Sequence, residues 1–238
     1  GAVIASYVEN FCTATDKIAA HFHEWMTAAG GLYLRRHAPY VATLFTTHAT
    51  VMGRCIAGNH LPLYTDLTKF NADELARQFN VVAKHSIEKA AAAYHDAFVT
   101  VSDITANECK FLLGREPDCI TPNGFENDFV WTGEEYDAKR AEARKTMISV
   151  AEACLGEKFA EEPLIVGTSG RYEFRNKGID VFIESLKKLA ASPRLKRQVL
   201  AYITVPAANR GPRADLQAHL ADPSKPIDGG QYKYTTHY

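Results

Sequence analysis

Short apolar runs alternate with longer stretches of helical periodicity along most of this chain. The runs predict buried β-strands at residues 17–21, 40–45, 97–101, 119–121, 164–168 and 198–205. Between them, apolar positions three and four apart predict helices at residues 24–37, 47–56, 71–90, 102–112, 132–155 and 177–190. Strands that alternate with helices are typical of a parallel sheet with crossover helices. The pattern therefore predicts an α/β fold.

The chain divides before Pro163. A capping-box pattern at Thr132 predicts the start of a long charged helix that ends near Gly156, and Pro163 then precedes a new strand, helix and strand. Residues 222–238 have no period and are expected to form a loop or a cut segment. The expected domains are the C-terminal part of one doubly wound, Rossmann-like domain at 1–155, a linker at 156–162, and the incomplete start of a second such domain at 163–238.

Polar side chains gather where the predicted strands end. His21 and His23 end the first strand, His48 follows the second, Asn123 follows the fourth, and Arg171 follows the first strand of the second domain. Ligands of open parallel sheets bind at the carboxyl ends of the strands. We therefore expect these residues to line a cleft between two domains, with His23 facing the cleft and His21 facing the other way.

Arg171 and Lys177 stand at the predicted start of a helix. Free N–H groups in a first helical turn, the positive end of the helix dipole and two cationic side chains together favour a phosphate or diphosphate. On charge patterning alone, two solvated cations in a turn are the alternative. Glu173 lies in the same loop, and an ion pair with Arg175 or Lys177 is its simplest role.

Several motifs occur together and change the balance between these alternatives. They are HFHEW at residues 21–25, FTTHATVMGR at 45–54, TPNG at 121–124, and GRYEF at 170–174 followed by NKG at 176–178. Together they resemble the glycogen synthases of the animal and fungal type, which are retaining glycosyltransferases of the GT-B fold. The resemblance runs from about residue 20 to residue 204.

The resemblance implies an activity and a set of site residues. The activity is transfer of glucose from UDP-glucose or ADP-glucose to the end of an α-1,4-glucan with retention, in glycogen biosynthesis, with no metal or other cofactor. His23 would lie against the donor sugar as a catalytic residue, and Arg171 and Lys177 would bind the donor diphosphate. His48 and Asn123 would line the cleft near the donor.

Two features of that family are missing from this chain. The family has a glycine-containing donor loop near its N-terminus and a paired-glutamate motif far into its second domain. We therefore expect an internal fragment of such an enzyme, inactive by itself. The alternatives are another retaining GT-B sugar transferase and a non-catalytic glucan-binding or regulatory domain that has the same fold.

The histidines and Asn123 also have simpler interpretations. His21 and His23 could supply two zinc ligands, but no further Cys or His pair stands at ligand spacing, so we expect no metal. One of the two could instead be packed and the other exposed. For His48 the alternative is a hydrogen-bonded core histidine, and for Asn123 it is a plain turn after Pro122.

The composition argues against a nucleic-acid-binding, membrane or secreted protein. The chain has 238 residues, of which 46% are hydrophobic, and its formal net charge is −1 with both signs evenly spread. Neither nucleic acid nor an anionic membrane is indicated as a partner. No apolar run approaches the length of a membrane span, and no secretory signal is visible. Five cysteines without C-x-x-C spacing predict reduced thiols in a cytoplasmic protein, and an unpaired strand edge near residues 199–205 would allow homo-oligomers.

Overall fold

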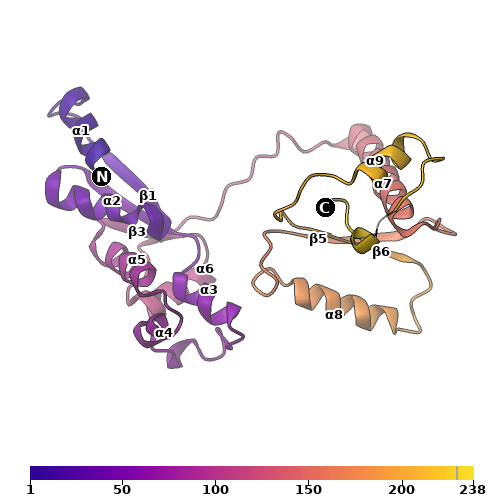
Figure 1. The fold of residues 1–238 in the computed structure, drawn as a ribbon. Coiled ribbons are helices and arrows are strands. Elements are labelled where there is room, and N and C mark those ends of the chain that lie inside the picture. Colours follow the sequence, from indigo (N-terminus) through magenta and orange to yellow (C-terminus); the bar gives the residue numbers. More distant parts are fainter. Residues whose placement is uncertain (229) are drawn as a thin grey trace. The chain divides into compact units, whose positions relative to one another are not determined.

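A computed structural model describes residues 1–228 and 230–238, and the chain forms two compact units at residues 1–125 and 126–238 (Figure 1). The elements of the first unit are α1 (Ala2–Phe11), β1 (Ala19–His23), α2 (Glu24–His37), β2 (Ala42–Thr47), α3 (Val51–Gly58), the 3-10 turn η1 (Leu67–Lys69), α4 (Ala72–Gln78), α5 (Val82–Tyr94), β3 (Ala97–Thr100), α6 (Asp103–Glu108), the π-helical turn η2 (Cys109–Leu113) and β4 (Cys119–Ile120). Those of the second unit are α7 (Gly133–Leu155), β5 (Leu164–Ser169), α8 (Ile179–Ala190), β6 (Val199–Thr204), α9 (Ala214–Ala221) and the 3-10 turn η3 (Gly230–Tyr232).

The first unit is built on a parallel sheet with the strand order β1-β2-β3-β4. Phe22 pairs in register with Phe45, and Phe45 with Phe98, so three aromatic side chains lie across the buried face. Helices α2 and α5 pack against each other and add Leu34 and Ala91 to the same core. The prediction of an α/β fold with parallel strands is confirmed for this unit.

Two predicted helices differ from those in the structure. The pattern at 71–90 predicts one helix, but α4 and α5 are separate, because Asn80 between them has a φ of 56° and cannot continue a right-handed helix. The long helix at 132–155 is present as α7, yet the side chain of Thr132 makes no capping hydrogen bond, so the capping box is wrong.

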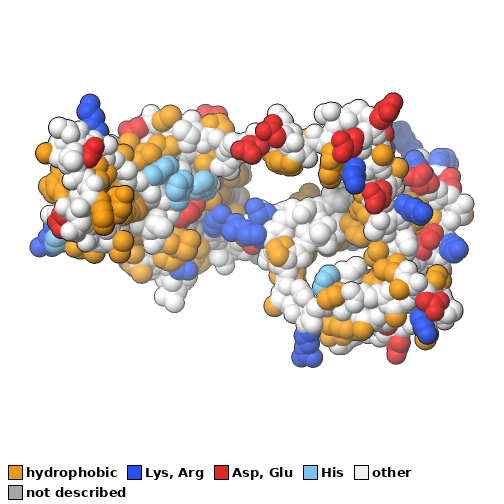
Figure 2. All heavy atoms as spheres, turned by 90° about the horizontal axis from the view of Figure 1, so that it is seen from above, with side chains coloured by type: hydrophobic (Ala, Val, Ile, Leu, Met, Phe, Trp, Pro, Cys, Tyr) orange, Lys and Arg blue, Asp and Glu red, His pale blue; other side chains and the backbone are white. Residues whose placement is uncertain are grey.

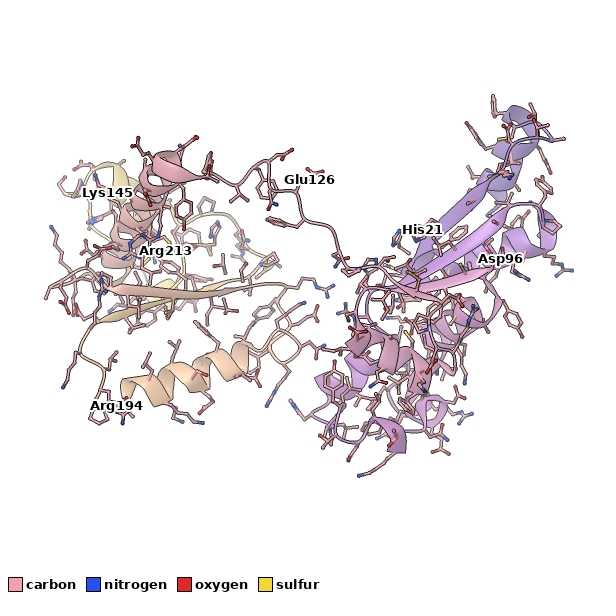
Figure 3. All side chains as sticks on the ribbon, turned by 180° about the vertical axis from the view of Figure 1, so that it is seen from behind. His21, Asp96, Glu126, Lys145, Arg194 and Arg213 are labelled. Carbon is pink, nitrogen blue, oxygen red and sulfur yellow. The ribbon has the colours of Figure 1, made fainter. Side chains whose placement is uncertain are left out.

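The second unit has two parallel strands, β5 and β6, in register from Leu164 and Val199 onward. Helix α8 lies on one face of this pair, and α7 and α9 lie on the other (Figures 1 and 3). The Tyr202 hydroxyl on β6 donates to the Met147 carbonyl on α7 over 2.6 Å. Helix α7 therefore packs within the second unit, whereas the sequence grouped it with the first domain. The assignment of 1–155 and 163–238 to two Rossmann-like domains stays a prediction.

A buried arginine organises the end of the chain. Arg213 is 0% exposed, and Figure 3 places it inside the second unit. Its Nη1 donates to the carbonyl oxygens of Tyr232 and Thr235 over 3.0 and 3.1 Å, and its Nη2 donates to Asp215 over 2.6 Å. The segment expected to be a loop therefore contains anchored backbone after α9, although position 229 within it lies outside the described residues.

No helix in the described part of the chain is long and apolar enough to cross a membrane. All five cysteines are described, and all five are free thiols.

Candidate functional site

Three histidine rings gather at the carboxyl ends of β1 and β2. His23 Nδ1 and His48 Nε2 are 3.0 Å apart and share a hydrogen bond. His21 Nε2 is 2.7 Å from the hydroxyl of Thr46, and the rings of His21 and His23 are 4.1 Å apart between centroids. Figure 2 shows histidine side chains together on the surface of the first unit. The strand register, which pairs His23 with Thr46, brings residues from two distant motifs into one cluster.

His21 and His23 face the same way, so the expectation that they face opposite ways is wrong. The strand runs from Ala19 to His23 and contains both residues, and alternate residues of a strand share a face. Both histidines are exposed, while Phe22 between them is buried. The same geometry excludes the arrangement with one packed and one exposed histidine.

The histidine cluster suits hydrogen bonding to a neutral polyol. Partial burial is the main cause that lowers the pKa of His21 below its ordinary value. Electrostatic repulsion from the nearby His23 and His48 lowers this pKa further. Within the His23–His48 pair one ring nitrogen donates and the other accepts, so the hydrogen bond couples the tautomers of the two rings. A ring nitrogen left outside that bond can donate to or accept from a sugar hydroxyl.

The β2–α3 loop that carries His48 is held from below by two buried carboxyl groups. Glu88 on α5 accepts hydrogen bonds from the Thr47 hydroxyl and the Val51 amide, each over 2.9 Å. Glu108 on α6 accepts from the Thr50 hydroxyl over 2.7 Å. Neither acid was predicted from the sequence as part of the site. For Glu88, the sequence does contain a pattern that could have indicated burial. Glu88 stands at helical spacing from other buried residues of α5, so an acid is expected on the buried face of that helix.

Arg171 and Lys177 lie near the carboxyl end of β5 in the second unit. Lys177 folds against Gly170, since a Cβ built on Gly170 would be 3.5 Å from the Lys177 side chain. Arg171 Nε forms an ion pair with Glu173 over 2.8 Å, and the side chain of Arg171 is 58% exposed. Glu173 therefore pairs with Arg171, whereas the sequence predicted a pair with Arg175 or Lys177. The cation of Arg171 is thus partly neutralised, and Lys177 packs along the backbone that precedes it.

The backbone amides at this turn are already bonded. Helix α8 begins at Ile179, two residues later than predicted, after Gly178 with a φ of 65°. The backbone amides of Lys177, Gly178 and Ile179 all donate hydrogen bonds to backbone carbonyl oxygens. The respective acceptors are the carbonyls of Glu173, Arg175 and Phe174. The prediction that free amides at 177–178 meet a phosphate is therefore wrong, because the turn before the helix uses them. An anion here would be bound by the cationic side chains.

Asn123 follows β4 in an exposed stretch of irregular backbone. Within the described residues no hydrogen bond joins it to the histidine cluster. Among the same residues, no three or more His, Cys, Asp or Glu side chains form a group that could hold a metal ion.

Comparison with known proteins identifies the family. The family model described as glycogen synthase matches residues 1–215. The chain belongs to the glycogen synthase family. Both the histidine cluster of the first unit and the Arg171–Lys177 turn of the second unit lie inside the range that the glycogen synthase family model matches.

Curated members of the glycogen synthase family are similar to most of the chain. Glycogen (starch) synthase of Dictyostelium discoideum is 36% identical over 200 residues, and isoform 2 of Saccharomyces cerevisiae is also 36% identical over 200 residues. The human liver glycogen (starch) synthase is 33% identical over 199 residues. These matches cover 81%, 81% and 80% of the chain, but only 23%, 28% and 28% of the respective relatives. The chain thus spans about a quarter of their length.

Proposed function

We propose that this chain is part of a retaining GT-B glycosyltransferase that transfers glucose from a nucleoside-diphosphate glucose to the non-reducing end of an α-1,4-glucan in glycogen synthesis. The donor is UDP-glucose or ADP-glucose. The single observation that carries the proposal is the family match over residues 1–215. Free thiols at all five described cysteines support a cytoplasmic setting.

The second unit supplies the charge that the reaction needs. The bond from glucose C1 to the diphosphate oxygen breaks and a bond from C1 to an acceptor hydroxyl oxygen forms. Negative charge develops on the leaving diphosphate, which takes up the proton of that hydroxyl. Arg171, which follows Gly170 in the chain, and Lys177, which packs against Gly170, would stabilise that charge electrostatically without a metal. Arginine suits this role because its planar fork of donors matches phosphate oxygens.

The first unit supplies groups for the donor sugar. His23 is exposed at the end of β1, and its ring is oriented by His48. We assign His23 to a hydroxyl of the transferred glucose. His48 is half-buried and would line the donor pocket, and so would Asn123, whose assignment rests on its motif.

The test is incorporation of labelled glucose into glycogen by the natural protein that carries this chain, with UDP-glucose and ADP-glucose supplied separately. Arg171→Ala should lower kcat by roughly 10²- to 10³-fold, about 3 to 4 kcal/mol, the usual effect of losing a donor that stabilises developing charge. The matched control is Arg194→Ala, which removes an exposed arginine after the other end of α8 (Figure 3). Absence of transfer in the wild type, or equal losses in both variants, would contradict the proposal.

A further inference from the structure

We propose that Glu24 is a positioning residue that fixes the His23–His48 pair and thereby selects which tautomer of His23 meets the substrate. The Glu24 carboxylate accepts a hydrogen bond from the backbone amide of His48 over 2.9 Å. The inference rests on the proposed function insofar as His23 touches the sugar. The effect of Glu24 on the tautomers of His23 and His48 can be measured without any substrate.

The backbone of Glu24 is unusual. Its φ is 62°, in the left-handed region that residues other than glycine, asparagine and aspartate rarely adopt. It is the first residue of α2, where an acidic side chain would ordinarily remain beside the helix N-terminus. Here the carboxylate reaches instead to the β2–α3 loop. Such strain persists only where surrounding contacts hold the residue in place, and it is concentrated at functional sites.

One residue thus controls both histidines. Glu24 follows His23 directly in the chain, and the carbonyl of His23 also accepts a hydrogen bond from the Thr27 hydroxyl over 2.5 Å. Through its side chain, Glu24 holds the backbone of His48. The 3.0 Å contact between the two rings therefore depends on the Glu24 bridge. If the bridge is lost, the ring of His48 is released and the tautomer of His23 is no longer fixed by its partner.

The bridge is separate from the supports that hold the loop in the core. Glu88 and Glu108 are buried and bind Thr47, Val51 and Thr50. Glu24 is only partly buried and binds His48, which is half-buried in the same loop. Its removal should therefore leave the loop attached to the core and disturb mainly the ring pair.

The first experiment measures the ring tautomers of His23 and His48 by ¹⁵N NMR in the 238-residue chain at neutral pH, together with hydrogen exchange of the His48 amide. The wild type should show one dominant, complementary tautomer pair and a protected amide. Glu24→Ala should give mixed tautomers and at least tenfold faster exchange. Glu24→Gln, whose amide oxygen can still accept the bond, should resemble the wild type, and Glu74→Ala is the control for loss of an exposed acid.

Glu24→Gly serves as a second variant, because glycine adopts a φ of 62° without strain and keeps the fold if alanine does not. It should behave like Glu24→Ala in the tautomer measurement. Unchanged tautomers and unchanged His48 exchange in the glycine variant would overturn the inference.

The second experiment separates positioning from substrate binding in the natural protein. Glu24→Ala and Glu24→Gly should lower kcat for glucosyl transfer by about tenfold or more while the KM for the donor changes by less than about threefold, since misplacement of a catalytic group is felt mainly in turnover. Glu24→Gln should restore most of kcat. A glutamine variant as impaired as alanine would overturn the inference. If the wild type transfers no glucose, the proposed function fails, and the tautomer result still decides the role of Glu24.

Discussion

A buried carboxyl group lies beneath the loop that presents His48. Glu88 is 0% exposed, and both of its oxygens accept hydrogen bonds from neutral groups, the Thr47 hydroxyl and the Val51 amide. Burial raises the pKa of Glu88 from 4.5 to about 7. The negative charges of Glu24 and Glu108 add to this increase, whereas the two hydrogen bonds oppose it. The acid is therefore partly protonated near neutral pH, at the base of the candidate site.

The raised pKa of Glu88 predicts a pH dependence of stability. The folded state holds this proton up to about pH 7, whereas the unfolded state releases it near 4.5, so folding binds a proton between these values. The contribution to stability is complete below about pH 4.5 and is lost as the pH rises through 7, by on the order of 3 kcal/mol.

Urea unfolding from pH 5 to pH 8 measures this effect. Trp131→Phe leaves Trp25 as the reporter of the first unit, and Glu88→Gln in that background should flatten the decline in the free energy of unfolding. The lowered pKa values of His85 and His95 act in the opposite direction below pH 6.5, so the difference between the two proteins is the relevant quantity. Identical pH slopes would contradict the assignment.

The ion pair between Glu173 and Arg171 gives a second residue-scale prediction. Arg171 has donors to spare, but the neighbouring carboxylate repels a bound phosphate. Glu173→Gln should therefore tighten UDP or ADP binding by about two- to fivefold, within the range of partly exposed charge pairs. Isothermal calorimetry on the 238-residue chain measures the change, and Glu184→Gln on α8 is the control for loss of an acid. Weaker binding in Glu173→Gln would mean that Glu173 serves chiefly to order Arg171.

At the scale of elements, the packing of α2 depends on a glycine. Gly31 lies over the ring of His95, which is buried between Phe22 and Phe45, and a Cβ on Gly31 would be 1.8 Å from His95 Nε2. His95 Nδ1 bonds the carbonyl of Ala91, which leaves Nε2 facing the glycine without a hydrogen-bond partner among the described residues. The close approach of α2 to the end of α5 therefore requires a residue without a side chain.

Gly31→Ala should destabilise the first unit by about 1 to 3 kcal/mol, because overpacking outweighs the gain in helix propensity of about 1 kcal/mol. Unfolding followed by Trp25 fluorescence in the Trp131→Phe background measures this. In the double variant Gly31→Ala/His95→Ala the clash is absent, so the loss of stability should be smaller than the sum of the two single losses. Additive losses would show that the clash is relieved by movement of α2.

The sequence pattern predicted elements better than their ends or contacts. Parallel strands at β2, β3, β5 and β6 are confirmed because each is a compact apolar run. The break at Asn80 was missed, since a left-handed residue depends on tertiary packing and asparagine is only one of several residues that tolerate it. His23 and His48 were each singled out, but their hydrogen bond depends on strand register, and no local pattern encodes the register of β1 against β2. The bridge from Glu24 was unpredictable for the same reason.

At the scale of the whole molecule, the histidine cluster belongs to one compact unit and the cationic turn to the other. The chain spans about a quarter of the length of its curated relatives. The resemblance described above implies that catalysis also needs a donor loop and a pair of glutamates, and the sequence does not contain either motif.

We therefore predict that the isolated 238-residue chain does not transfer glucose. Groups that act together in catalysis lose nearly all of their effect when members are absent, so turnover should be at least about 10³-fold below that of the natural protein. Incorporation of labelled glucose into glycogen by the purified chain, with the natural protein assayed in parallel, is the measurement. Robust turnover by the chain alone would mean that these residues form a complete small enzyme.

The buried guanidinium of Arg213 limits where the C-terminal segment of this chain can be truncated. A cut before Tyr232 would remove the carbonyl acceptors of Tyr232 and Thr235 and leave a desolvated cation with only Asp215 beside it. Proteases that trim loose termini should accordingly stop short of this stretch while the unit is folded. A recombinant version that ends after Thr236, whose carbonyl accepts a hydrogen bond from the Arg213 amide, keeps all of these acceptors, whereas one that ends between Arg213 and Tyr232 loses them and should be less stable.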